Sequence, residues 1–230
     1  MEKISPWLLA IILPVATLQA FSSSFIYDFP QVFEAILIQR MGINAYKVQI
    51  LYSIGTLPNL CSNLIGSLFI PKLGVGYIVL IYQTFAFNGA ALTYLAVRMN
   101  NYNFLCFGRL FVGISFDLCC LSSLLCCEKW FRGKFLSISV GLSEIIRLLG
   151  SSTCYYFLPK LFLSSRNMEA SAFCAVVVCF IIFSTTTIFA ILDIKYEHLL
   201  KIDEVGEKNE DLDLQKTLNQ QTESENFNIY

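Results

Sequence analysis

Six long runs of apolar residues, separated by shorter polar segments, dominate the pattern along the chain. A helix needs about 20 apolar residues to cross the hydrocarbon core of a bilayer, and each run has that length. We predict six transmembrane helices, at about residues 6–27, 48–70, 74–97, 104–127, 135–162 and 170–192. Because lipid offers no partner to an open backbone, these spans must be helical. The pattern therefore predicts an all-α, polytopic membrane protein.

The segments between the predicted spans are short, with one exception. Residues 28–47 form a longer connection whose centre is apolar, at Val32, Phe33, Ile36 and Leu37. We expect a short interfacial helix there.

The charges divide the chain into two parts. The whole chain is 56% hydrophobic and only 14% charged, whereas soluble domains carry about 25% charged residues. Residues 1–193 hold 12 Lys/Arg and 8 Asp/Glu, a net +4, and residues 194–230 hold 4 and 9, a net −5. We predict a six-helix transmembrane domain at 1–193 and an acidic, disordered, cytosolic tail at 194–230. Basic residues flanking the spans, densest at residues 129–134, favour both termini on the cytosolic side.

Several classes of function lack the residues that they need. The only histidine is His198 in the tail, so a Ser–His hydrolase or a zinc protease inside the membrane is excluded. No phosphate-binding Gly-x-x-x-x-Gly-Lys-Ser/Thr loop occurs, and no basic cluster exceeds three charges, which argues against ATP hydrolysis and nucleic-acid binding. We expect no enzymatic activity, no cofactor and no bound metal.

Ionisable residues inside the predicted spans are the candidates for function, because each costs at least ~2.5 kcal/mol to insert. In the fourth span, Arg109, Gly113 and Asp117 recur every four residues and share one helix face. The rise of about 12 Å from Arg109 puts Asp117 near the middle of the bilayer.

Glu144 and Arg147 of the fifth span are three residues apart, so they are neighbours on one face. One interpretation is that they neutralise each other as a structural pair. The other is that Asp117 and Arg147 offer one negative and one positive site in a shared cavity, which would suit a zwitterion with separated ends.

Small residues at helical spacing suggest close contacts between helices. They occur as the pairs Gly108/Gly113, Gly141/Ser137 and Gly150/Ser151.

The segment Gly108-Arg109-Leu110-Phe111-Val112-Gly113-Ile114 resembles the fourth-helix motif of the major facilitator superfamily, an Arg followed four residues later by Gly. Other strings resemble the lysosomal dipeptide transporter branch of that superfamily over about residues 20–155. These strings are Tyr27-Asp28-Phe29-Pro30, Leu51-Tyr52-Ser53, Pro58-Asn59 and Trp130-Phe131-Arg132-Gly133-Lys134.

The resemblance implies roles for several residues. Asp117, where the family usually has Glu, would hold the amino end of a peptide, and Arg147, with Glu144 beside it, would hold its carboxylate. Arg109, Gly113 and Asp28 would serve coupling or gating. The resemblance also implies a lysosomal or other endomembrane location and a glycosylated accessory membrane partner.

The chain departs from the family in two respects. The Asp-Arg expected in the loop after the second helix falls on Ile70-Pro71, and six spans correspond to the amino-terminal half of a superfamily transporter. We therefore expect a secondary transporter or half-transporter for a small organic solute, with dipeptides as one candidate class, acting as a homodimer. The alternatives are a truncated, non-transporting membrane protein that binds or regulates a full-length transporter, and an incomplete gene product.

Overall fold

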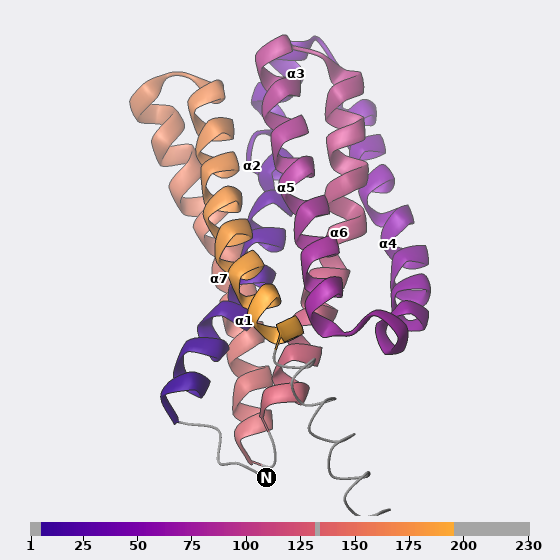
Figure 1. The fold of residues 1–230 in the computed structure, drawn as a ribbon. Coiled ribbons are helices and arrows are strands. Elements are labelled where there is room, and N and C mark those ends of the chain that lie inside the picture. Colours follow the sequence, from indigo (N-terminus) through magenta and orange to yellow (C-terminus); the bar gives the residue numbers. More distant parts are fainter. Residues whose placement is uncertain (1–5, 132–133, 196–230) are drawn as a thin grey trace, which may run out of the picture. The chain divides into compact units, whose positions relative to one another are not determined.

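A computed structural model describes residues 6–131 and 134–195, and every element in these two ranges is a helix (Figure 1). The helices are α1 (Pro6–Tyr27), α2 (Phe29–Val32), α3 (Glu34–Met41), α4 (Ala45–Leu73), α5 (Val75–Met99), α6 (Tyr102–Trp130), α7 (Lys134–Ser165) and a last helix at Met168–Lys195. The chain divides into two compact units, Met1–Ile191 and Leu192–Tyr230. The acidic tail expected at 194–230 lies, beyond residue 195, outside the described residues.

Each of the six predicted spans is a long helix at its predicted place, and the connection at 28–47 contains the short helices α2 and α3. Its interfacial position stays a prediction. Among the described residues, four helices are long and apolar enough to cross a membrane: α5, α6, Phe135–Ser165 within α7, and Met168–Lys195. In α1 and α4, some side chains lie outside the described set. The number of six spans therefore stays a prediction. Four of the six helices have the length and composition that a membrane span requires.

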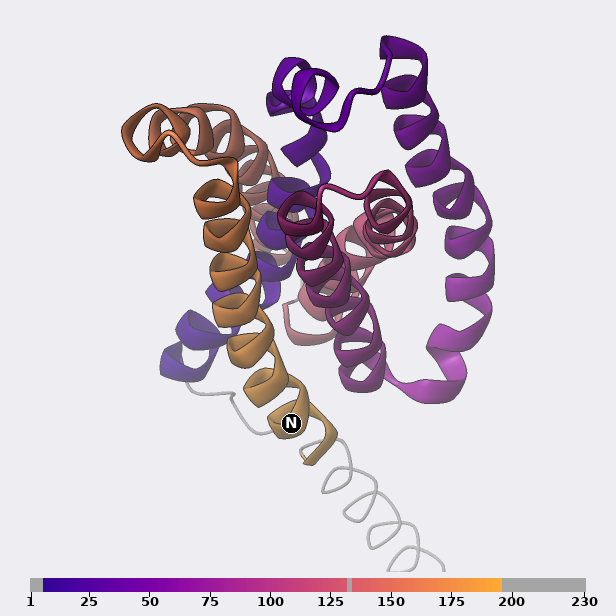
Figure 2. The ribbon, with the colours of Figure 1, turned by 90° about the horizontal axis from the view of Figure 1, so that it is seen from above.

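Helix α6 is the centre of the bundle, where it packs against α5, α4 and α1, while α1 also packs extensively against α7. Seen from above, α5 and α6 lie between α4 on one side and the helix that begins at Met168 on the other (Figure 2). Long helices that follow one another run in opposite directions (Figure 1). The α1–α7 contact and the α4–α6 contact each join one of the first three long helices to one of the last three.

Two buried glutamines join the central helices. Gln19 of α1 accepts a hydrogen bond from the Ser122 hydroxyl of α6 at 2.9 Å. Gln83 of α5 donates to Ser22 Oγ of α1 at 2.8 Å and accepts from the Cys119 thiol of α6 at 3.7 Å. All five residues have exposed fractions of zero. These bonds link α1, α5 and α6 through side chains that are fully buried in the bundle.

Glycines permit the closest helix crossings. A Cβ at Gly113 of α6 would collide with the Gly55 carbonyl of α4, and a Cβ at Gly150 of α7 would collide with the Phe21 carbonyl of α1. The prediction of close contact is thus confirmed for Gly113 and Gly150. It is wrong for Gly141, where a Cβ would meet nothing within 4 Å, because Gly141 lies on an exposed face of α7.

The connection between α1 and α4, which contains α2 and α3, packs against the long helices. Phe33 is buried and packs edge-on against Phe162 of α7, with ring centroids 5.9 Å apart. Arg40 of α3 forms an ion pair with Glu169 at 2.6 Å, and its carbonyl accepts a hydrogen bond from Asn100 at 3.1 Å. This connection therefore packs as part of the bundle.

Candidate functional site

Charged side chains of α6 and α7 act on one another electrostatically. Arg147 Nε donates to Glu144 Oε2 at 2.8 Å, and the two side chains are 29% and 45% exposed. Asp117 of α6 is partly buried and acts electrostatically on Arg147 of α7. Cys120, one turn beyond Asp117, lies in the field of all three charges. Arg147 therefore has one acidic partner on its own helix and a second acidic neighbour on the facing helix.

Arg109 lies apart from this cluster, in a different environment. Its side chain is only 2% exposed, and its guanidinium stacks on the Tyr27 ring at 4.1 Å and faces the Tyr52 ring at 5.3 Å. Its Nη1 donates to the Tyr27 carbonyl, at the last residue of α1. The final carbonyls of a helix lack intrahelical donors and carry partial negative charge. Arg109 therefore caps the end of α1, and the two rings stabilise its charge.

Asp28 and Gly113, the other two candidates for gating, both lie near Arg109. Asp28 begins α2 without capping it through its side chain, and its carboxylate acts electrostatically on Arg109 and Tyr52. Gly113 is one turn beyond Arg109 on α6 and faces the Gly55 carbonyl. The six predicted site residues thus form two groups, one around Arg147 and one around Arg109.

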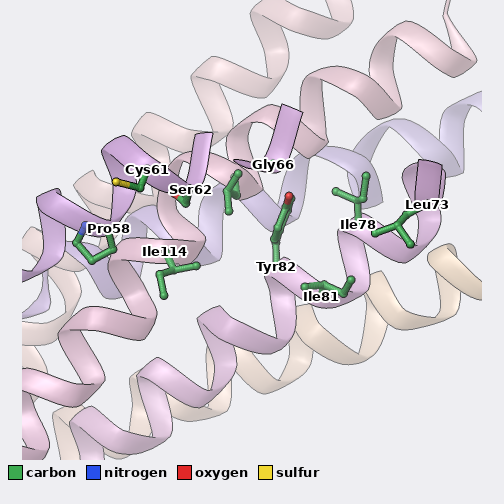
Figure 3. Close-up of a pocket in the computed structure, with 10 residues that line it drawn as sticks. Pro58, Cys61, Ser62, Gly66, Leu73, Ile78, Ile81, Tyr82 and Ile114 are labelled. Carbon is green, nitrogen blue, oxygen red and sulfur yellow. The ribbon is translucent and has the colours of Figure 1, made fainter. Parts of the chain in front are cut away.

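An apolar pocket of about 470 Å³ opens between α4, α5 and α6 (Figure 3). It is lined by Pro58, Cys61, Ser62, Gly66, Leu73, Ile78, Ile81, Tyr82, Ile114 and Leu118. A Cβ at Gly66 would lie 2.8 Å from the Tyr82 hydroxyl, so glycine at this position leaves room for that hydroxyl. None of the predicted site residues lines this pocket, and its walls suit hydrocarbon rather than a charged solute.

The sequence interpretation did not single out the aromatic partners of Arg109. Tyr27 and Tyr52 are contributed by α1 and α4, so only the packing of those helices against α6 brings their rings to the guanidinium. A weaker signal was available for Gln19 and Gln83, since an amide inside an apolar run must find a partner.

Among the described residues, no three His, Cys, Asp or Glu side chains lie close enough to hold a metal ion.

The arrangement defines a class of protein: a polytopic membrane protein with ionisable side chains between its apolar helices. No family model matches the chain. A curated relative is the lysosomal dipeptide transporter MFSD1 of Danio rerio, which is 26% identical over 133 residues, or 57% of this chain. That match spans 29% of the relative's length. The chain is thus similar, over part of its length, to a membrane transporter.

Proposed function

We propose that this chain is a secondary transporter, or one half of one, that moves a small organic solute across a lysosomal-type membrane by alternating access. Dipeptides are the solute class that we propose. The similarity to a relative named as a lysosomal dipeptide transporter supports both the class and the membrane. It also supports a role in binding and movement rather than in enzymatic catalysis.

The observation that carries this proposal is that Asp117 of α6 acts electrostatically on Arg147 of α7. A dipeptide has an ammonium group at one end and a carboxylate at the other. In our proposal Asp117 binds the ammonium group and Arg147 binds the carboxylate. Glu144 holds Arg147 in the absence of solute, through the hydrogen bond at 2.8 Å.

The packing of the helices supports a transporter architecture. The six long helices form two sets of three in chain order: α1, α4 and α5, then α6, α7 and the helix from Met168. The first helix of each set packs against the second helix of the other set, α1 against α7 and α6 against α4. Inverted three-helix repeats of this kind occur within the six-helix halves of major facilitator transporters. We propose six spans with both termini cytosolic. A second copy of this chain can provide the complementary half, with a glycosylated membrane protein as a further partner.

Arg109, Gly113 and Asp28 have a separate role in this proposal. They lie where the end of α1 meets α4 and α6, and not beside Arg147. Alternating access requires helices to move against one another, and Gly113 lets α6 approach the backbone of α4. We propose that these three residues couple solute binding to that movement.

Reconstitution of the purified chain into liposomes, followed by uptake of a labelled dipeptide, tests the function. We expect saturable uptake that is lost in Asp117→Asn, because the amide cannot neutralise the ammonium group of the solute. Glu128→Gln is the matched control, since Glu128 is an exposed acid near the end of the same helix, and it should leave uptake unchanged.

The alternative to this proposal is a membrane protein that binds or regulates another transporter without transporting solute itself. Well-inserted protein that takes up no dipeptide, but raises the uptake of a co-reconstituted transporter, would favour that alternative. Equal uptake by Asp117→Asn and the unmodified protein would remove Asp117 from the site.

A further inference from the structure

The buried guanidinium of Arg109 uses only one of its edges. Nη1 donates to the Tyr27 carbonyl, whereas Nε and Nη2 are both buried with no hydrogen-bond acceptor in the described part of the chain. The N–H groups of Nε and Nη2 point in the same direction. This edge is the one that binds both oxygens of a carboxylate side by side.

The surroundings of this edge bring the α4 backbone close and add another donor. A Cβ at Gly55 of α4 would lie 2.8 Å from Nε, so glycine at this position keeps a side chain away from the edge. The Tyr52 hydroxyl, three residues earlier on α4, is also buried without a hydrogen-bond partner among the described residues. The Arg109 N–H groups and the Tyr52 hydroxyl are therefore hydrogen-bond donors that lie together and lack an acceptor among the described residues.

We propose that Arg109, Tyr52 and Gly55 form a carboxylate site where α4 and α6 cross. A carboxylate supplies two coplanar oxygens for Nε and Nη2, together with the negative charge that a buried cation needs. A spherical anion offers one acceptor centre to both N–H groups, so its two hydrogen bonds are bent, whereas those to a carboxylate are linear. The carboxylate site is distinct from the cluster around Arg147, whose Nε is already engaged by Glu144.

The carboxylate can come from this chain or from a solute. Asp28 follows directly after Tyr27, acts electrostatically on Arg109, and makes no capping hydrogen bond to α2. A change at the junction of α1 and α2 that carries the Asp28 carboxylate to the free edge would pair the two residues. The other source is the carboxylate of a small molecule that enters between α4 and α6. Both sources present the same group to the same edge.

Thermal unfolding of the full-length chain in detergent, with sodium formate or sodium chloride at equal ionic strength, tests the carboxylate site. If a solute is the source, formate raises the Tm of the unmodified protein by about 2–4 °C over chloride, and Arg109→Gln abolishes this rise. If Asp28 is the source, the unmodified protein does not respond. Asp28→Ala then has a lower Tm that formate restores, and Asp28→Ala combined with Arg109→Gln shows no restoration.

Further variants keep the test decisive if Arg109→Gln does not fold. Arg109→Lys retains the charge without the two-pronged edge, and Gly55→Ala places a methyl group against Nε, so each should remove the preference for formate over chloride. Arg98→Gln, at the exposed end of α5, should not.

Three results would overturn the carboxylate site. The first is the absence of any formate effect in both the unmodified protein and Asp28→Ala. The second is an undiminished formate effect in Arg109→Gln or Arg109→Lys. The third is a formate effect that Arg147→Gln removes and the Arg109 variants retain, because formate would then bind at the proposed solute site. Stability is the readout, so the test does not depend on whether the chain transports anything.

Discussion

Arg147 interacts with two acids, and the strengths of the two interactions differ. Its pair with Glu144 is direct, at 2.8 Å, but both side chains are partly exposed. Exposed pairs of this kind contribute at most ~1 kcal/mol. Charge-assisted hydrogen bonds in a closed site are stronger, at about 1.5–3 kcal/mol. In the proposed function, a solute carboxylate therefore displaces Glu144 once Asp117 holds the other end of the solute.

Arg147→Gln should lower the affinity for a dipeptide with a free carboxyl group by about 10- to 100-fold, because a charge-assisted hydrogen bond is lost. The affinity for the amidated dipeptide should change little. Binding of both ligands is measured by titration calorimetry on the detergent-purified chain. Arg147→Lys keeps the charge, so its affinity for the free-acid dipeptide should lie between those of the unmodified protein and Arg147→Gln. An Arg147→Gln variant that still discriminates the free acid from the amide would contradict the assigned role.

The buried side-chain amide of Gln83 contributes to stability rather than to solute binding. Gln83 Nε2 and Ser22 Oγ are 2.8 Å apart in a region without exposed surface. Gln83→Leu keeps the volume and removes the hydrogen bonds, so we expect a loss of about 1 kcal/mol, or a Tm lower by about 2–4 °C. Gln49→Leu, on the exposed face of α4, should not lower the Tm. Equal unfolding temperatures for Gln83→Leu and the unmodified protein would show that this network adds no stability.

At the scale of the elements, α6 determines the arrangement because three helices pack on it. Its crossing with α4 depends on Gly113 facing the Gly55 carbonyl, and the matching crossing of α7 with α1 depends on Gly150 facing the Phe21 carbonyl. Two backbones approach this closely only where no side chain separates them. Both crossings therefore join one of the first three long helices to one of the last three.

Gly113→Ala should lower the Tm, since the added methyl group must push α4 away from α6. Gly141→Ala is the matched control: a Cβ there meets nothing within 4 Å. That change should leave the Tm the same or higher, because Ala favours a helix over Gly by about 1 kcal/mol. Both variants are compared in detergent by thermal unfolding. If Gly113→Ala were as stable as Gly141→Ala, the crossing would tolerate more separation than the structure indicates.

At the scale of the whole molecule, the number of spans decides which side of the membrane each connection faces. Alkaline phosphatase fused after residue 43, 101 or 167 should be active in a bacterial host if all six long helices span with a cytosolic amino terminus. Fusions after residue 74 or 133 should be inactive. If only the four helices identified by length and composition span, the fusion after residue 43 becomes inactive and the others are unchanged. That one fusion therefore separates six spans from four.

The sequence by itself determined where the long helices lie and which charges are inside them. Apolar runs of span length leave a backbone no alternative to a helix in lipid, so each long helix was predicted to within about one turn. The spacing of Glu144 and Arg147 on one helix likewise predicted their contact, because residues three apart are neighbours in any α-helix.

Only the tertiary structure decided what meets across helices. Helical periodicity determines which residues share a face, but the facing helix, and the depth at which it crosses, follow from side-chain packing over the whole bundle. The predicted close contact at Gly141 was wrong for this reason, while that at Gly113 was confirmed. The stacking of Tyr27 and Tyr52 on Arg109 and the free edge of its guanidinium could not be predicted from spacing, because they depend on three helices that pack together.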